Sequence, residues 1–217
     1  MARRTSRRTQ GPGGKGNDNA LSSFLASVDR FVETVSGQAL AAAGAGDQQL
    51  VIRSTGESLV AQTRRLTDYV REVAAGTSPM QRRELDQFLR VQDGDALVER
   101  AVAVTEQVLS GKAGPVTLGF FSWLDEIIHT LKKIILEILF IIFHGHIPLW
   151  ILIILLIIDE LINLLKSLVG GAFGLRMSEV ADEASRAEVN FLREITALVA
   201  LRGAQFSRRT NDDEALS

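Results

Sequence analysis

The chain lacks cysteine altogether, so disulfides, thiolate metal sites and a cysteine nucleophile are all excluded. It also lacks an excess of charge of either sign, because 24 Lys and Arg residues nearly balance 26 Asp and Glu residues and leave a formal net charge of −2. A global attraction to nucleic acid or to anionic lipid is therefore not expected. Beyond the amino-terminal tail, basic residues are dispersed among acidic ones without interleaved aromatic residues, so we expect no nucleic-acid partner.

Motifs that carry enzyme chemistry are missing as well. The sequence contains no phosphate-binding glycine loop after a strand, no HExxH motif and no serine or threonine nucleophile motif. We therefore expect a non-enzymatic protein with no catalytic residue, no cofactor and no metal. His144 and His146 could converge on a metal ion from one turn, but no carboxylate or cysteine close in sequence completes a ligand set. A polar loop that meets water or lipid headgroups is the favoured interpretation.

The first 19 residues form a basic segment that we predict to be disordered. Its basic residues include Arg3, Arg4, Arg7 and Arg8. No apolar run follows these arginines, so the segment does not have the pattern of an export signal. Its composition cannot bury a core, which predicts a solvated tail. The alternative is contact with anionic lipid headgroups, worth about 1 kcal/mol for each basic residue near the surface.

Helical periodicity dominates residues 20–111, which we predict to be an amphipathic helical domain. Apolar residues recur at spacings of three and four from Leu21 to Val35. A second pattern repeats every seven residues from Ile52 to Val73. Each pattern gives its helix one apolar face, and such faces can pack together or cover a hydrophobic centre.

The clearest helix start combines Ser78 as the N-cap, Pro79 at the first helical position and Gln81 as the capping-box partner. A further amphipathic helix is expected over 176–207, and a disordered tail over 208–217. No segment alternates as a strand does, so the predicted fold class is all-α, with a hydrophobic helical hairpin flanked by amphipathic helices.

That hairpin is predicted from the apolar stretch at 134–158. Its 25 residues would make about 37 Å of helix, enough to cross a hydrocarbon core of about 30 Å, so hydropathy alone would predict one transmembrane helix. The centre is broken by polar and helix-breaking residues, namely His144, Gly145, His146 and Pro148. Such residues are costly at a bilayer midplane. We therefore predict a hairpin over 116–169 that reverses at 144–147.

Charged residues on both sides of the break support the hairpin. Each helix carries one polar stripe of residues at spacings of three and four. The stripes consist of Asp125, Glu126, His129, Lys132 and Lys133 in the first helix and Asp159, Glu160, Asn163 and Lys166 in the second. The reversal places residues equally far from the turn opposite each other. The predicted partners are Lys132 and Lys133 with Asp159 and Glu160, His129 with Asn163, and Asp125 and Glu126 with Lys166.

Glu137 lies inside the apolar part, opposite Ile154 and Leu155, so the hairpin itself offers it no polar partner. The carboxylate can snorkel, be protonated or bond to a neighbouring backbone. Alternatively, it belongs to a seam between subunits or to a seam that faces water. The uninterrupted apolar parts measure only about 15 and 18 Å as helices and are too short to span a bilayer alone. Either the stripes also enter the membrane, buried by neighbouring copies or lining water, or the hairpin is a wedge in one leaflet.

A single kinked span is the rival interpretation. It would place Lys132 and Lys133 at the cytoplasmic end and the carboxylates of Asp159 and Glu160 at the far end, as the positive-inside tendency favours. The hairpin has a different consequence for topology. Its loop lacks Lys and Arg while both flanks carry them, so it predicts a membrane protein with both termini in the cytoplasm.

The pattern over 117–169 resembles, in plan, the α-helical pore formers of the colicin type, in which amphipathic helices hold a hydrophobic hairpin. The resemblance includes no specific motif. We therefore expect a protein whose hairpin inserts in a bilayer and self-associates as a homo-oligomer, forming a pore or permeabilising the membrane. The alternative is a membrane-anchored scaffold or adaptor whose cytosolic helical domain binds a protein partner, including a phage or viral structural membrane protein.

Overall fold

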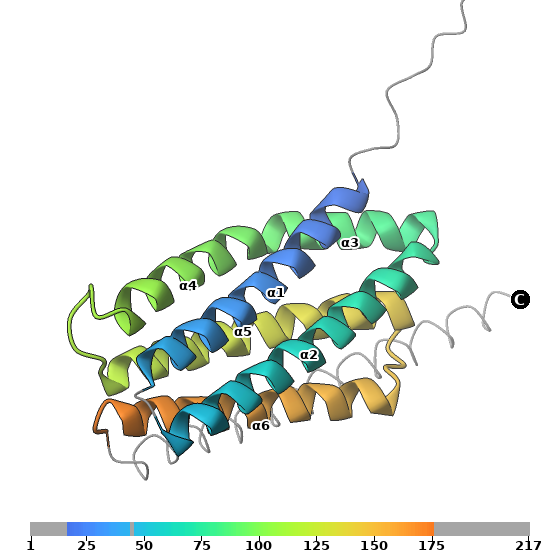
Figure 1. Ribbon diagram of the computed structural model, residues 1–217. Coiled ribbons are helices and arrows are strands. Elements are labelled where there is room, and N and C mark those ends of the chain that lie inside the picture. Colours follow the sequence, from blue (N-terminus) through green and yellow to red (C-terminus); the bar gives the residue numbers. More distant parts are fainter. Residues whose placement is uncertain (1–16, 44–45, 176–217) are drawn as a thin grey trace, which may run out of the picture.

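The computed structural model describes residues 17–43 and 46–175, and these residues form six α-helices and no strand (Figure 1). The predicted all-α class is therefore confirmed for this part of the chain. The helices are α1 (Asn17–Ala42), α2 (Asp47–Ala75), α3 (Pro79–Gln92), α4 (Gly94–Leu109), α5 (Leu118–Phe143) and α6 (Leu149–Ala172). The first helix begins at Asn17, within the range 1–19 that was assigned to the tail.

The start of α3 has the predicted capping box. The Gln81 backbone N–H donates to Ser78 Oγ at 3.3 Å, and the Ser78 backbone N–H donates to Gln81 Oε1 at 2.9 Å. Pro79 occupies the first turn, where a missing N–H costs nothing. The corner between α2 and α3 is therefore a tight turn, with Gly76 at the end of α2.

The predicted apolar faces of α1 and α2 meet in the interior. Ile52, Leu59 and Leu66, which share the seven-residue repeat of α2, are almost completely buried. The side-chain Oγ of Ser36 on α1 lies 3.5 Å from the Gly56 carbonyl of α2, and a Cβ added at Gly56 would lie 3.1 Å from Ser36 Cβ. Small residues therefore let these two helices approach closely.

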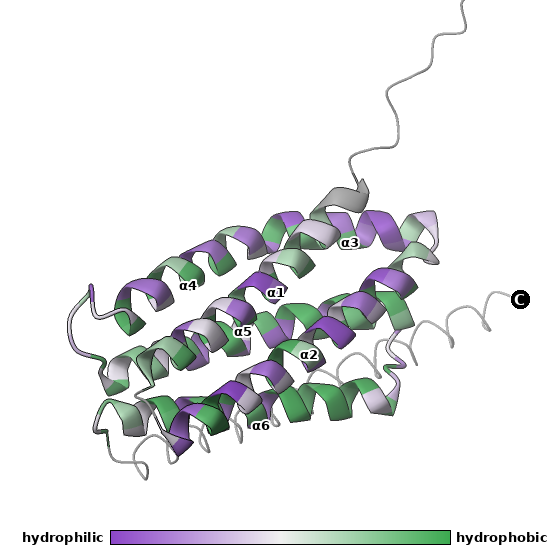
Figure 2. Cartoon of the chain, viewed as in Figure 1, coloured by the Kyte–Doolittle hydropathy of each residue, from purple (hydrophilic) through white to green (hydrophobic). Residues whose placement is uncertain are grey.

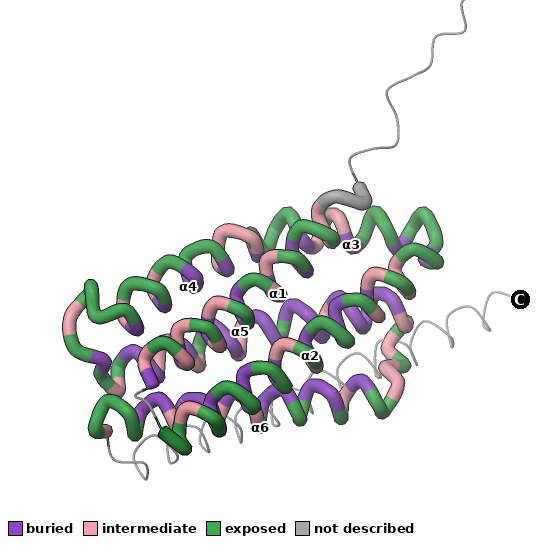
Figure 3. Tube along the Cα trace, in the orientation of Figure 1, coloured by how far each residue is buried: buried purple, intermediate pink, exposed green. Residues whose placement is uncertain are grey.

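The helices form a bundle in which α1 packs against α2 and α4, while α2 also packs against α6 (Figure 1). The hydrophobic residues are concentrated in α5 and α6, whereas α1 to α4 are mixed (Figure 2). The α5 helix is buried along most of its length, while α1 to α4 present exposed turns outward (Figure 3). The amphipathic helices therefore cover α5, one of the two most hydrophobic helices that the structure describes.

The chain reverses between α5 and α6 at 144–148, so the fold corresponds to the hairpin and not to a single kinked helix. His144 and Gly145 have positive φ angles of 49° and 84° and make the turn. Gly145 N–H donates to the Phe140 carbonyl at 3.1 Å. Pro148 is the N-cap and Leu149 begins α6, so the reversal extends one residue beyond the predicted 144–147.

The α6 helix ends in a Schellman motif. Gly174 has a φ of 75°, its N–H donates to the Gly171 carbonyl, and the Leu175 N–H donates to the Gly170 carbonyl at 2.9 Å. The described chain ends at Leu175. The predicted helix at 176–207, the tail at 208–217 and the arginines of the amino-terminal tail lie outside the described residues.

Within the described residues, no helix is both long enough and apolar enough to cross a membrane. Charged residues interrupt both hydrophobic helices, for example Lys132 in α5 and Asp159 in α6. The transmembrane helix that hydropathy alone suggested for 134–158 is therefore not present as one continuous helix.

Candidate functional site

Two ion pairs join α5 to α6 in the interior of the bundle. Lys132 Nζ donates to Asp159 Oδ1, and each side chain is only 9% exposed. Lys166 Nζ donates to Asp125 Oδ1, and these side chains are 3% and 15% exposed. Both pairs join residues equally far from the turn, as the predicted register requires. Buried charges need such partners because an unpaired ion away from water is strongly unfavourable.

These four charges influence one another. Burial lowers the pKa of Lys132 below its usual range, and the adjacent Asp159 carboxylate opposes that effect. Lys166 lowers the pKa of Lys132 further, whereas Asp125 raises it. The two pairs therefore form one cluster of alternating charge between α5 and α6.

The remaining members of the predicted stripes lie closer to the surface. Glu126 and Lys133 on α5 and Glu160 on α6 are exposed, while His129 and Asn163 are half-buried. In each of the three adjacent charged pairs, the structure turns one side chain toward the interior and the other toward solvent. The pairs are Lys132 and Lys133, Asp159 and Glu160, and Asp125 and Glu126. Adjacent residues on a helix point about 100° apart, so both members of such a pair cannot face the partner helix.

Glu137 is half-buried and takes part in a hydrogen-bonding or electrostatic interaction. Its carboxylate is therefore not isolated, although the facing residues of α6 are apolar.

The first half of α6 exposes an apolar stripe. Its members are between 37% and 71% exposed, and they are Leu149, Trp150, Ile153, Leu156 and Ile157. Their spacings of three and four place them on one face of the helix. Opposite that face, Ile151, Ile154 and Leu155 are buried. We refer to the five exposed residues as the α6 stripe.

The hairpin turn touches two residues that were not predicted to contact it. Tyr69 of α2 lies between Phe143 and Trp150, with ring centroids 6.3 and 4.5 Å away. Gln81 of α3 donates from Nε2 to the Ile141 and Ile142 carbonyls at 3.2 and 3.0 Å. Tyr69 lies within the second predicted helical pattern, and Gln81 was assigned to a cap. Neither pattern identifies a partner distant in the sequence.

His144 and His146 lie exposed in the turn, and His146 Nδ1 is 3.3 Å from the His144 carbonyl oxygen. Within the residues that the structure describes, no group of three His, Asp or Glu side chains is arranged to hold a metal ion.

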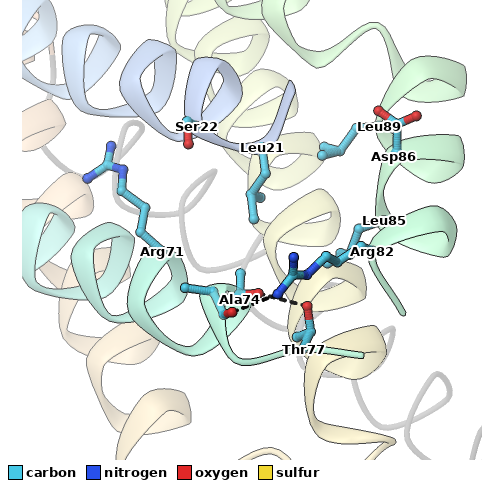
Figure 4. Close-up of a pocket in the computed structure, with 10 residues that line it drawn as sticks. Leu21, Ser22, Arg71, Ala74, Thr77, Arg82, Leu85, Asp86 and Leu89 are labelled. Carbon is cyan, nitrogen blue, oxygen red and sulfur yellow. Dashed lines mark hydrogen bonds between the residues drawn. The ribbon is translucent and has the colours of Figure 1, made fainter. Parts of the chain in front are cut away.

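A pocket of about 160 Å³ lies beside the corner between α2 and α3 (Figure 4). Its walls include Leu21, Arg71, Arg82 and Asp86. Arg82 reaches back across the corner and donates to the Ala75 carbonyl at 2.9 Å, while Thr77 Oγ1 donates to the Ala74 carbonyl at 2.7 Å. The volume is below the 300 to 1,000 Å³ of typical small-molecule sites. A second cavity, of about 590 Å³, lies between α1 and α2 and is lined in part by Arg53, Glu57 and Arg64. The hairpin, which combines buried ion pairs with an exposed apolar stripe, is the stronger candidate for a functional element.

Comparisons of the chain with protein-family models, with curated proteins and with solved structures found no match.

Proposed function

We propose that this protein acts on lipid bilayers without enzymatic chemistry. In this proposal the end of the α5–α6 hairpin inserts into the bilayer, copies associate, and the membrane is permeabilised. The observation that carries the proposal is the α6 stripe, an exposed apolar surface next to the turn that joins the two most hydrophobic of the described helices. The transfer of such an apolar surface from water into hydrocarbon is favourable.

The distribution of charge supports entry by the turn end. The ten residues of α5 before the turn and the first ten of α6 contain one ionisable residue, Glu137. The two buried ion pairs lie farther from the turn, and each joins α5 to α6. A hairpin that moves as one unit therefore keeps these charges paired and needs no new partner for them.

The dimensions favour a wedge in one leaflet. Ten helical residues extend about 15 Å, roughly half of a hydrocarbon core of about 30 Å. Insertion to that depth leaves the paired charges near the headgroups. It also agrees with the lack of a described helix that could span a membrane.

Self-association and topology belong to the same proposal. Lys133 on α5 and Glu160 on α6 are exposed and of opposite charge, so copies placed side by side can pair them. A hairpin returns the chain to the side from which it entered, so both termini stay on that side, which the positive-inside tendency identifies as the cytoplasm.

Dye release from liposomes tests the proposal. The purified full chain should release dye, and Ile153→Glu should abolish most of the release because it places a charge on the α6 stripe. Val91→Glu is the matched control, because Val91 is 75% exposed on α3, away from the hairpin. A wild-type chain that releases no dye, or equal release by both variants, would contradict the proposal.

A further inference from the structure

We infer that Tyr69 and Gln81 form a clasp that holds the hairpin turn in the bundle and sets how readily the hairpin is released. The inference rests on the proposed function and identifies how the same element is regulated. The two residues come from α2 and α3, on either side of the corner at 76–78. We call them, together with their contacts to the turn, the clasp.

Gln81 completes the hydrogen bonding at the end of α5. The last carbonyls of a helix have no partner within the helix. At this turn, the Gly145 N–H bonds to the Phe140 carbonyl and the His146 N–H bonds to the Phe143 carbonyl. The two carbonyls between them, of Ile141 and Ile142, accept from Gln81 Nε2 instead. The hairpin therefore depends on another helix for these two bonds.

The local structure around Gln81 fixes the orientation of its side-chain amide. Its side chain is buried, and its Oε1 is already occupied by the Ser78 N–H of the capping box. The capping box thus orients the amide so that its NH₂ group faces α5. Arg82 and Thr77 hold the backbone of the same corner through their bonds to Ala75 and Ala74 (Figure 4). The donor is therefore held in place before the turn docks against it.

Tyr69 adds an aromatic contact on both sides of the turn. Its ring stacks with Phe143 at the end of α5 and meets Trp150 at the start of α6 edge to face. Trp150 belongs to the α6 stripe. One residue of α2 thus holds both helices of the hairpin at the end that the proposed function sends into the bilayer.

Release of the turn requires all of these contacts to break. The Ile141 and Ile142 carbonyls must then find water or headgroup donors, because buried carbonyls without a partner are unfavourable. The buried ion pairs do not add to this barrier, since each lies within the hairpin. The clasp is therefore where a small change should loosen the turn, while the packing of α2 against α6 holds the rest of the hairpin.

The sharpest test replaces Gln81 with glutamate. Gln81→Glu keeps an oxygen for the Ser78 N–H and suits the start of a helix, but it removes both donors to α5. Gln48→Glu is the matched control, because Gln48 Nε2 donates to the Leu168 carbonyl at the other end of α6. Tyr69→Leu removes the aromatic contacts independently. Circular dichroism establishes that each variant is folded.

Two measurements separate the clasp from the proposed function. Hydrogen exchange in solution should speed up on the order of tenfold in peptides covering 138–152 of Gln81→Glu and Tyr69→Leu, with α4 peptides unchanged. Both variants should also release liposome dye several-fold faster than the wild type, while Gln48→Glu should not. Unchanged exchange near the turn, or faster exchange without faster release than an active wild type, overturns the clasp. Dye release by none of the proteins contradicts the proposed function instead, whatever the exchange shows.

Discussion

Lys132 of α5 and Asp159 of α6 form an ion pair in the interior of the bundle, with each side chain 9% exposed. The pair joins the two helices that precede and follow the same turn. It therefore determines which residues of α5 and α6 lie at the same level. Together with Lys166 and Asp125, it makes a buried charge cluster between two largely hydrophobic helices.

Removing one partner of this pair should be far more harmful than removing both. Lys132→Met leaves the Asp159 carboxylate buried without its cation and should lower the free energy of unfolding by roughly 3 to 5 kcal/mol. The double variant Lys132→Met, Asp159→Leu replaces the pair with apolar side chains and should recover most of that loss. Urea unfolding of the three proteins measures both effects. A single variant as stable as the wild type would show that the pair is not a buried ion pair in solution.

The stability of the wild type relative to that double variant should depend on pH. Burial lowers the pKa of Lys132 in the folded chain below its ordinary value of 10.5. Between those two values the unfolded chain binds more protons, so the stability of the wild type should rise with pH toward 10.5 relative to the double variant. The contribution is lost as the pH falls through the folded pKa. Unfolding midpoints of both proteins across alkaline pH measure the difference, and a gap that widens in favour of the double variant would contradict the assigned direction.

Glycine is required at the start of α4 because the ring of Phe24 lies close to the Gly94 backbone. A Cβ atom at Gly94 would lie 2.7 Å from ring carbons of Phe24, which is almost completely buried. Gly94→Ala should therefore destabilise the chain by about 1 to 3 kcal/mol. Gly37→Ala is the control, because a Cβ there meets nothing within 4 Å, and it should be neutral or stabilise α1 by up to about 1 kcal/mol. Thermal unfolding should give Gly94→Ala a midpoint below that of the wild type and Gly37→Ala a midpoint equal to or above it. Equal midpoints for the two variants would contradict the packing at Gly94.

Glu137 distinguishes a membrane-permeabilising hairpin from an anchor that only tethers an adaptor domain. If a polar seam is needed in the inserted state, Glu137→Leu should lose dye release while the chain remains folded and bound to liposomes. A tether should tolerate this change, because it makes the hairpin more apolar. Glu126→Leu, an identical substitution at an exposed position of the same helix, should keep its activity. Full dye release by Glu137→Leu would show that permeabilisation needs no polar seam at Glu137.

The hairpin register could be predicted from the sequence because buried charges pair with charges of opposite sign. Lys132, Asp159, Asp125 and Lys166 occur at matching distances from a turn marked by His144, Gly145 and Pro148. In an apolar environment, a charged side chain has few polar partners other than a side chain of opposite charge. The start of α3 was predictable for a similar reason, since Ser78 and Gln81 satisfy each other locally.

The clasp and the α6 stripe could not be predicted from the sequence. Every apolar residue from Leu149 to Ile157 has a comparable claim to burial, and the packing of α2 against α6 decides which of them remain exposed. Gln81 contacts carbonyls that lie 60 and 61 positions farther along the chain. Backbone acceptors have no side-chain signature, so no local pattern points to them.

The depth of Trp150 in a bilayer directly reports whether the turn end of the hairpin inserts. Trp123→Phe leaves Trp150 as the only tryptophan of the two in the chain and makes its fluorescence a specific reporter of the turn end of α6. With liposomes, we expect a blue-shifted emission that is quenched by lipids brominated on the acyl chain and not by aqueous iodide. Emission that stays accessible to iodide and insensitive to the brominated lipids would contradict insertion of the hairpin.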